Sequence, residues 1–143
     1  MKGEKGIGQD LWKGEKGEKI NEWMNMKEIE SLRIYQLAVE IGEMVWQIVN
    51  SWEDKFAKWT VGKQWVESAD SISATMKEGY YRNQKGDLRK FFQYSFSSAK
   101  EAEHWLSKSY HRKLVSESQY QELEKKFQDY FPQTVNFINK IEK

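Results

Sequence analysis

Apolar residues recur at steps of three and four over almost the whole chain after residue 26, and a single proline, Pro132, interrupts the pattern. Such spacing places the apolar side chains on one face of a helix. The pattern predicts four helices, at about 27–51, 58–78 and 88–111 and from 117 to the end. Because the links are short, consecutive helices are expected to be antiparallel, which gives an all-α, up-down-up-down four-helix bundle.

Local signals predict where these helices end. Gly79 is expected to be a left-handed C-terminal residue of the second helix, and Asp87 is a plausible N-cap of the third. Ser116 and Gln119 fit a capping box at the start of the fourth. Pro132 should kink or divide the fourth helix, because proline cannot donate the backbone hydrogen bond.

The second helix is unusually rich in small side chains, which are Ser68, Ala69, Ser71, Ser73, Ala74 and Thr75. Serine and threonine are mediocre helix formers, so helix propensity does not explain this composition. Small residues let neighbouring backbones approach closely, and larger ones such as Trp65 and Met76 then fill the remaining volume. The composition predicts close packing of this helix.

The first 26 residues differ from the rest of the chain. Residues 1–20 are charged, repeat the motif KGEKG and contain only four large apolar residues, Ile7, Leu11, Trp12 and Ile20, so they bury too little surface to offset chain entropy. We expect a flexible leader at 1–26 and a bundle domain at 27–143. The alternative is a docking tail that uses Leu11 and Trp12.

Several classes of protein are disfavoured. The chain has no cysteine, which excludes disulfides and thiolate metal sites. It has no apolar run of about 18 residues and no apolar signal core, so we expect a cytoplasmic protein without membrane contact. No phosphate loop or nucleophile elbow is present, so we expect neither an enzyme nor a cofactor. Glu101 and His104 have the spacing of a di-iron motif, but the second pair that such a site needs is missing; no metal is expected.

The net charge of +1 disfavours a dedicated nucleic-acid domain and leaves only local basic clusters. The first cluster lies beside Tyr80 and Tyr81, whose rings could stack on unpaired bases; it consists of Arg82, Lys85, Arg89 and Lys90. The second lies near the C-terminal end of the third helix and consists of Lys108, His111, Arg112 and Lys113. The alternatives are a solvated turn with buried tyrosines for the first, and cations favoured by the helix dipole for the second.

Aromatic residues make up 15% of the chain, including seven tryptophans. This is more than one thin bundle needs, and tryptophan is enriched at interfaces. Trp52, Trp59 and Trp105 are therefore predicted to form contacts between subunits. The alternative is that they cap the ends of the bundle and are partly exposed.

Four segments together resemble one bacterial family: SLRIYQLAVEIGEMVWQIV from Ser31, TVGKQ from Thr60, ADSISATMKEGYYR from Ala69 and LVSESQYQELEKKF from Leu114. The chain resembles the four helix bundle protein family over roughly residues 28–143. That family includes proteins encoded by intervening sequences within the large-subunit ribosomal RNA gene. It also includes the accessory variability determinant of diversity-generating retroelements.

The resemblance implies a four-helix bundle that assembles into a barrel-like homopentamer. For retroelement members it implies an accessory role, binding a reverse transcriptase and RNA or DNA through basic surfaces; for most members it implies no known activity. We therefore expect a non-enzymatic, homo-oligomeric ring that binds nucleic acid or a nucleic-acid enzyme through basic loops. In a ring, five copies could bind one nucleic acid at the same time, so that individually weak phosphate contacts would raise the overall affinity. The alternative is a protein-only scaffold or interaction module.

Overall fold

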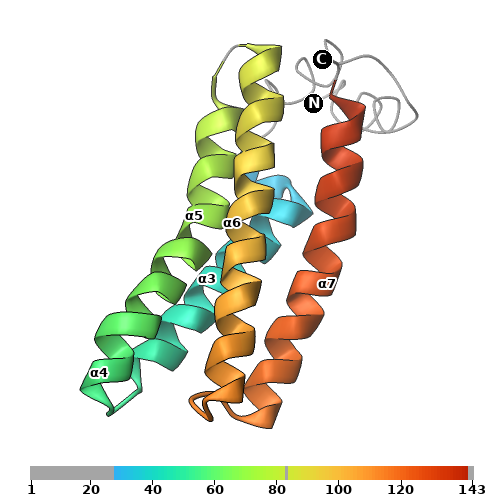
Figure 1. The fold of residues 1–143 in the computed structure, drawn as a ribbon. Coiled ribbons are helices and arrows are strands. Elements are labelled where there is room, and N and C mark those ends of the chain that lie inside the picture. The colour runs from blue at the N-terminus through green and yellow to red at the C-terminus, as the bar shows by residue number, and fades with distance from the viewer. Residues whose placement is uncertain (1–27, 83, 142–143) are drawn as a thin grey trace.

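The computed structural model describes residues 28–82 and 84–141, and this part of the chain is helical without any strand. Its four long helices are α3 (Arg33–Asn50), α5 (Lys63–Tyr80), α6 (Lys85–His111) and α7 (Glu117–Lys140). Consecutive helices run in opposite directions (Figure 1). α3 packs on α5 and α7, and α6 packs on the same two helices. The predicted all-α class and four-helix bundle are confirmed, while the predicted leader at 1–26 lies outside the described residues.

Three of the predicted helix starts are corrected, and the third of these is α6, which begins three residues before its predicted start near 88. A 3₁₀ turn, η1 (Ile29–Ser31), and the extended Leu32 precede α3, so the first α-helix begins six residues later than its predicted start near 27. The second helical segment begins with α4 (Lys55–Ala57) and a π-helical turn, η2 (Lys58–Gly62), and then continues into α5. Asp54 starts α4, because its Oδ1 accepts the Ala57 N–H at 3.0 Å.

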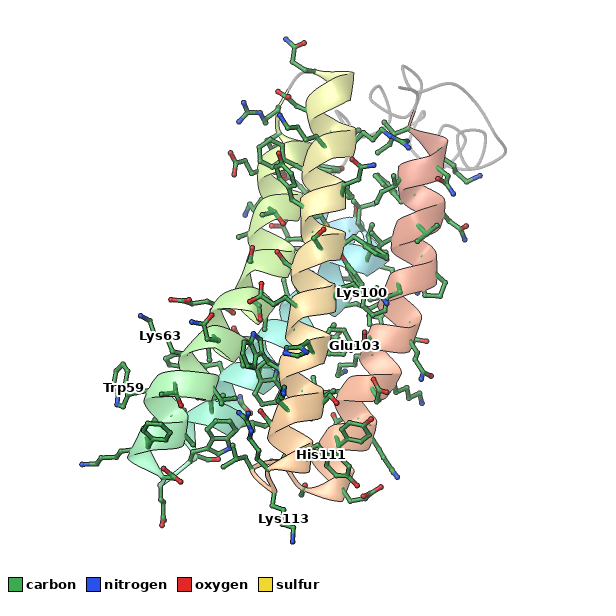
Figure 2. The ribbon with its side chains drawn as sticks, viewed as in Figure 1. Trp59, Lys63, Lys100, Glu103, His111 and Lys113 are labelled. Atoms are coloured by element: carbon green, nitrogen blue, oxygen red, sulfur yellow. The ribbon has the colours of Figure 1, made fainter. Side chains whose placement is uncertain are left out.

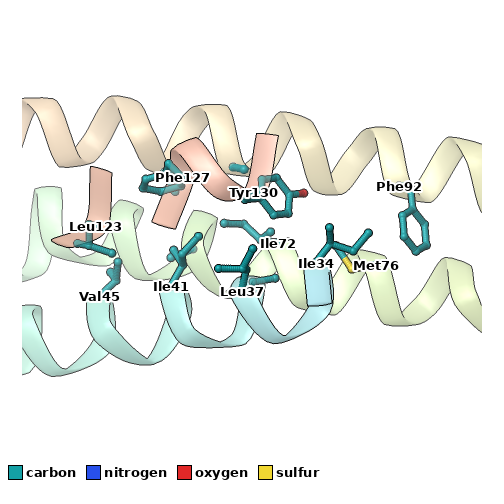
Figure 3. Packing of buried hydrophobic residues seen from close by; sticks show 14 of the residues in the cluster. Ile34, Leu37, Ile41, Val45, Ile72, Met76, Phe92, Leu123, Phe127 and Tyr130 are labelled. Carbon is teal, nitrogen blue, oxygen red and sulfur yellow. The ribbon is translucent and has the colours of Figure 1, made fainter. Parts of the chain in front are cut away.

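The core runs along the whole bundle and draws large side chains from all four long helices (Figure 3). Two of its buried hydroxyls are hydrogen-bonded in series: Ser95 Oγ donates to the Ile72 carbonyl at 2.7 Å, so the Tyr130 hydroxyl donates to Ser95 Oγ at 2.6 Å. Burial raises the pKa of Tyr130 to about 12. Among the described helices, none is both long enough and apolar enough to cross a bilayer.

Close packing between α5 and α6 confirms the expected role of the small residues. Ala69 on α5 and Ala99 on α6 are fully buried, and Ser71 Oγ lies 3.0 Å from Ser98 Oγ on the facing helix. Gly79 is part of this contact, because a Cβ there would lie 2.4 Å from the Cβ of Phe91. The prediction of a left-handed C-terminal glycine was wrong: Gly79 lies inside α5 and is required by the approach of α6.

Of the remaining predictions about helix ends, one is confirmed and the others are not. The capping box of α7 is confirmed, with Ser116 Oγ accepting from Gln119 N at 3.1 Å and Gln119 Oε1 accepting from Ser116 N at 3.0 Å. Asp87 is not an N-cap; Gln84 is, and Asp87 lies in the first turn of α6. Pro132 does not divide α7, which is continuous. Because Pro132 is exposed, water can hydrate the carbonyl that loses its partner.

Candidate nucleic-acid interface

The two predicted basic clusters lie at opposite ends of the bundle. The α5–α6 end contains the turn between those helices, with Arg82, Lys85, Arg89 and Lys90; the α6–α7 end contains Lys108, His111, Arg112 and Lys113. Along α6 the two ends are separated by about 30 Å at 1.5 Å per residue. One short ligand therefore contacts only one of them on a given subunit.

At the α5–α6 end, two of the five N–H donors of Arg82 have carboxylate partners. Its Nε donates to Asp87 Oδ2 at 2.9 Å and its Nη1 to Glu78 Oε2 at 3.2 Å. Its guanidinium carbon also lies 4.9 Å from the centre of the Phe91 ring. The hydrogen bond to Asp87 raises the pKa of Arg82. A phosphate at Arg82 would have to compete with the negative charge of these two carboxylates.

Arg89 has a structural role at the same end. Its Nη1 donates to the carbonyl of Ile138 at 2.8 Å and to that of Ile141 at 3.3 Å, and so satisfies the C-terminal end of α7. Lys90 is exposed and has no ion-pair partner among the described residues. Lys85 is the first residue of α6, and its side chain lies outside the described part.

The two tyrosines beside this cluster are also engaged. Tyr80 is buried, and its ring meets that of Tyr81 edge-on at 5.1 Å. The Tyr81 hydroxyl donates to Glu28 Oε1 at 3.1 Å and accepts from the Ile29 N–H at 3.4 Å. These contacts fix the start of the described chain against α5.

The basic residues of the α6–α7 end are arranged differently. Lys108, His111, Arg112 and Lys113 are all exposed, and none has an ion-pair partner among the described residues. Figure 2 shows His111 and Lys113 at the lower end of α6, with Lys113 pointing away from the bundle. These side chains are available to an anionic ligand.

Lys113 occupies an unfavourable backbone conformation. Its φ is +62°, in the left-handed region where glycine is the usual residue. The Leu114 N–H donates to Ser109 O at 2.8 Å and the Lys113 N–H to Tyr110 O at 3.0 Å, the hydrogen-bond pattern of a Schellman motif. A lysine in this conformation costs about 1–2 kcal/mol. Lysine thus places a positive charge at a position where glycine would give a more stable fold.

An aromatic groove adjoins this basic cluster. It has a volume of about 810 Å³ and lies between the α4–η2 segment and the C-terminal part of α6. The side chains of Phe56 and Trp59 are 79% and 71% exposed, and Trp105 forms part of the opposite wall. Lys63 and Arg112 also line the groove, and neither has an ion-pair partner among the described residues. Aromatic faces and unpaired cations therefore meet in one open hollow.

Trp105 is held in place by its neighbours. Its Nε1 donates to Glu101 Oε2 at 3.2 Å, and the His104 ring meets its ring edge-on at 4.9 Å. The E-x-x-H pair thus orients this tryptophan. In the described ranges, no group of three or more His, Asp or Glu side chains is placed to hold a metal ion.

The three tryptophans predicted at subunit contacts have different surroundings. Trp52 is half-buried, packs against the core and lies 6.1 Å from the Trp65 ring. Trp105 is half-buried in the groove wall, and Trp59 points away from the bundle (Figure 2). Of the three, Trp59 has by far the most surface left for a ligand or a second subunit.

Sequence reasoning did not single out three residues of this surface, which are Trp46, Phe56 and Lys63. Trp46 is 52% exposed and lines a second groove, of about 400 Å³, between α3 and η2. Phe56 and Trp59 are three residues apart in the link SWEDKFAKW, and Lys63 follows four residues later. That helical spacing was the available signal, but the predicted helix began at 58 and left Phe56 outside it.

These features define the class of protein: a four-helix bundle with an open basic and aromatic surface at one end. A family model described as 23S rRNA-intervening sequence protein matches residues 30–133. The chain belongs to that family. Among curated protein sequences, none matches.

A solved structure supports the fold. It is the crystal structure of a protein of unknown function from the S23 ribosomal protein family of Bacteroides thetaiotaomicron. The two chains are 16% identical, and the match covers 73% of this chain and 97% of the other, with a TM-score of 0.68. At this identity the likeness establishes a shared bundle and leaves the function to be argued from the site.

Proposed function

We propose that this protein is a non-enzymatic, homo-oligomeric accessory protein that binds nucleic acid through the α6–α7 end of its bundle. The proposal rests on a difference between the two ends of the bundle in how the basic side chains are paired. Arg112 and its neighbours are exposed without ion-pair partners among the described residues, whereas Arg82 and Arg89 donate to groups of the same chain. The family description refers to an intervening sequence of 23S rRNA and names no ligand, so the proposal rests on the surface alone.

Binding through phosphate contacts predicts a steep dependence on salt. Each contact contributes a slope of about −0.7 in a plot of log affinity against log salt for single strands. The test is fluorescence anisotropy with labelled RNA and DNA oligonucleotides. In the variant Lys108→Gln/Arg112→Gln/Lys113→Gln we expect weaker binding and a salt slope smaller by about 2.

The matched control removes the same charge elsewhere. The variant Lys77→Gln/Lys100→Gln/Lys125→Gln changes three exposed lysines on α5, α6 and α7. It should keep most of the wild-type affinity and slope. Equal losses in both variants would mean that bulk charge, not this surface, drives binding, and absence of any salt-dependent binding would overturn the proposal.

Self-association is the second part of the proposal. The exposed Trp46 and the apolar side chains of Val49 and Val66 line the groove between α3 and η2, a surface that a second copy could cover. We expect a pentamer-sized particle in light scattering. Trp46→Lys should shift it toward monomer, and a clean monomer of the wild-type protein at micromolar concentration would exclude the ring.

A protein-only scaffold is the second candidate function, and a specific observation favours it: Phe56, Trp59 and Trp46 present large apolar surfaces to solvent. A protein partner, including a nucleic-acid enzyme such as a reverse transcriptase, would cover them. Salt separates the two functions, because an aromatic interface is much less sensitive to salt than phosphate contacts. An oligomer that ignores RNA and DNA at low salt would leave the scaffold as the better account.

A further inference from the structure

The groove between η2 and the end of α6 joins two kinds of binding group. Its aromatic members are Phe56, Trp59 and Trp105, and its cations are Lys63 and Arg112. Its volume, about 810 Å³, is twice that of the groove on the other side of η2, at about 400 Å³. It is therefore large enough for a planar ring with a charged group attached.

The rings of the groove are open on their faces. Phe56 and Trp59 are among the most exposed large apolar residues of the described chain, and neither has a ring partner there. Trp105 is fixed by Glu101 and His104. One fixed wall and two uncovered rings form a surface on which another planar ring can stack.

The backbone presents Trp59 in an unusual way. The residue lies in the π-helical turn Lys58–Gly62, and such turns are rare and are often found at functional sites. Gly62 lets this turn pack on the core, because a Cβ there would lie 2.7 Å from Val49 Cγ1 and 3.2 Å from the Trp52 ring. The turn is thus seated on α3 while Trp59 projects into solvent (Figure 2).

The charges around the groove favour an anionic occupant. Lys63 and Arg112 line it without ion-pair partners among the described residues, and Lys108 and Lys113 lie one helical turn or less from Arg112. Among the described lining residues the one carboxylate is that of Asp54, whose Oδ1 accepts the Ala57 N–H. A planar ring joined to a phosphate matches this arrangement.

We propose that this groove binds an unpaired nucleotide of a single-stranded nucleic acid, with its base stacked on Trp59 and its phosphate at Arg112 and Lys63. The inference rests on the proposed function and narrows it to single strands. Bases inside a duplex are stacked on each other and cannot offer a face to Trp59, whereas a single strand offers one at every nucleotide. A phosphate-only surface would bind both forms.

The experiment compares a labelled oligouridylate, which does not self-pair, with a blunt hairpin duplex of the same length. The full-length protein is titrated at fixed salt, and tryptophan fluorescence is recorded with anisotropy. We expect the single strand to bind more tightly and to quench fluorescence. Trp59→Ala should weaken this binding about 5- to 100-fold with an unchanged salt slope, because one stacked base is lost and no phosphate contact is.

Two variants serve as controls. Trp59→Phe keeps a ring face and should recover part of the affinity. Tyr94→Ala removes an exposed aromatic ring on α6, about 16 Å from Trp105 by helix rise, and should bind like wild type. Trp59 also lines the groove between α3 and η2 that is proposed for self-association, so light scattering of Trp59→Ala accompanies the titration, and an unchanged oligomer separates base stacking from subunit contact.

Each contrary result has a distinct meaning. Equal binding of duplex and single strand, or full affinity in Trp59→Ala, would overturn the stacking site while leaving salt-dependent binding by the α6–α7 end intact. Dissociation of the oligomer in Trp59→Ala would assign Trp59 to a subunit contact, as the sequence predicted, and would also overturn the inference. No binding of either probe at low salt would remove the proposed function as well.

Discussion

At the α5–α6 end of the bundle, Arg82 and Arg89 donate to carboxylates and carbonyls of the same chain, whereas at the α6–α7 end Arg112 has no such partner among the described residues. The tyrosines of the first end are buried or hydrogen-bonded, while Trp59 at the second is open. Both ends combine basic and aromatic residues in sequence. Only three-dimensional pairing separates a basic cluster that stabilises the fold from one that is available for binding.

The largest effect expected on stability concerns the packing of the α5–α6 end. In Gly79→Ala the new Cβ would lie 2.4 Å from the Phe91 Cβ, so α5 and α6 must move apart. We expect the free energy of unfolding to fall by about 2 kcal/mol, within the usual range for overpacking. Urea denaturation measures the change.

Gly86→Ala is the matched control, at the second residue of α6. A Cβ at this position would meet nothing within 4 Å, and alanine is the better helix former. We expect no loss of stability, or a gain of up to about 1 kcal/mol. Similar losses in both variants would show that the approach of α5 to α6 is not what requires Gly79.

The next prediction compares one arginine from each end. Arg89→Ala removes two hydrogen bonds to the end of α7 and should lower the free energy of unfolding by about 1–1.5 kcal/mol. Arg112→Ala should change stability by less than about 0.5 kcal/mol, because its side chain is exposed. Thermal denaturation of both variants measures these changes, and nucleic-acid binding is measured on the same samples. A larger loss of stability in Arg112→Ala than in Arg89→Ala would contradict the comparison.

Sequence reasoning found the bundle because helical spacing and the Ser116–Gln119 capping box are local signals, which tertiary contacts rarely reverse. It misplaced Gly79 for the opposite reason. A glycine near the end of a helix is typical both of a left-handed cap and of a close helix contact, and only the position of Phe91 on α6 distinguishes them.

The candidate site was only partly predictable for a related reason. Both basic clusters were visible as sequence runs, but the partners that engage Arg89 lie 49 and 52 residues further along the chain. The groove likewise joins Trp59 to Arg112, which are remote in sequence and meet only through the packing of α5 on α6. Local sequence patterns do not predict contacts between residues that are so far apart in the chain.

The backbone at Lys113 provides a smaller test of the α6–α7 end. Lys113→Gly relieves the left-handed conformation and should raise the free energy of unfolding by about 0.5–1 kcal/mol, after the extra flexibility of glycine in the unfolded chain is counted. The same change removes a cation and should weaken nucleic-acid binding. Lys113→Gln removes the charge and keeps the strain, so it should weaken binding without the gain in stability. A stabilised glycine variant that binds like wild type would take Lys113 out of the interface.

The smallest effect concerns an ion pair between the two ends, where Lys126 on α7 donates to Glu40 on α3 at 3.2 Å. This hydrogen bond, together with the charges of Lys126 and Arg33, lowers the pKa of Glu40 from the ordinary value of a glutamate. The pair therefore stabilises the fold above that ordinary pKa, and its contribution disappears as the pH falls through the lowered pKa. Lys126→Gln should lower stability by less than about 1 kcal/mol near neutral pH and by nothing in acid.

Lys125→Gln, which removes the neighbouring exposed charge, should show no such pH dependence. If Lys126→Gln were instead strongly destabilising, exposed pairs such as those of Arg82 would also hold the fold together, and the contrast between the two ends would then reflect stability as much as the availability of donors.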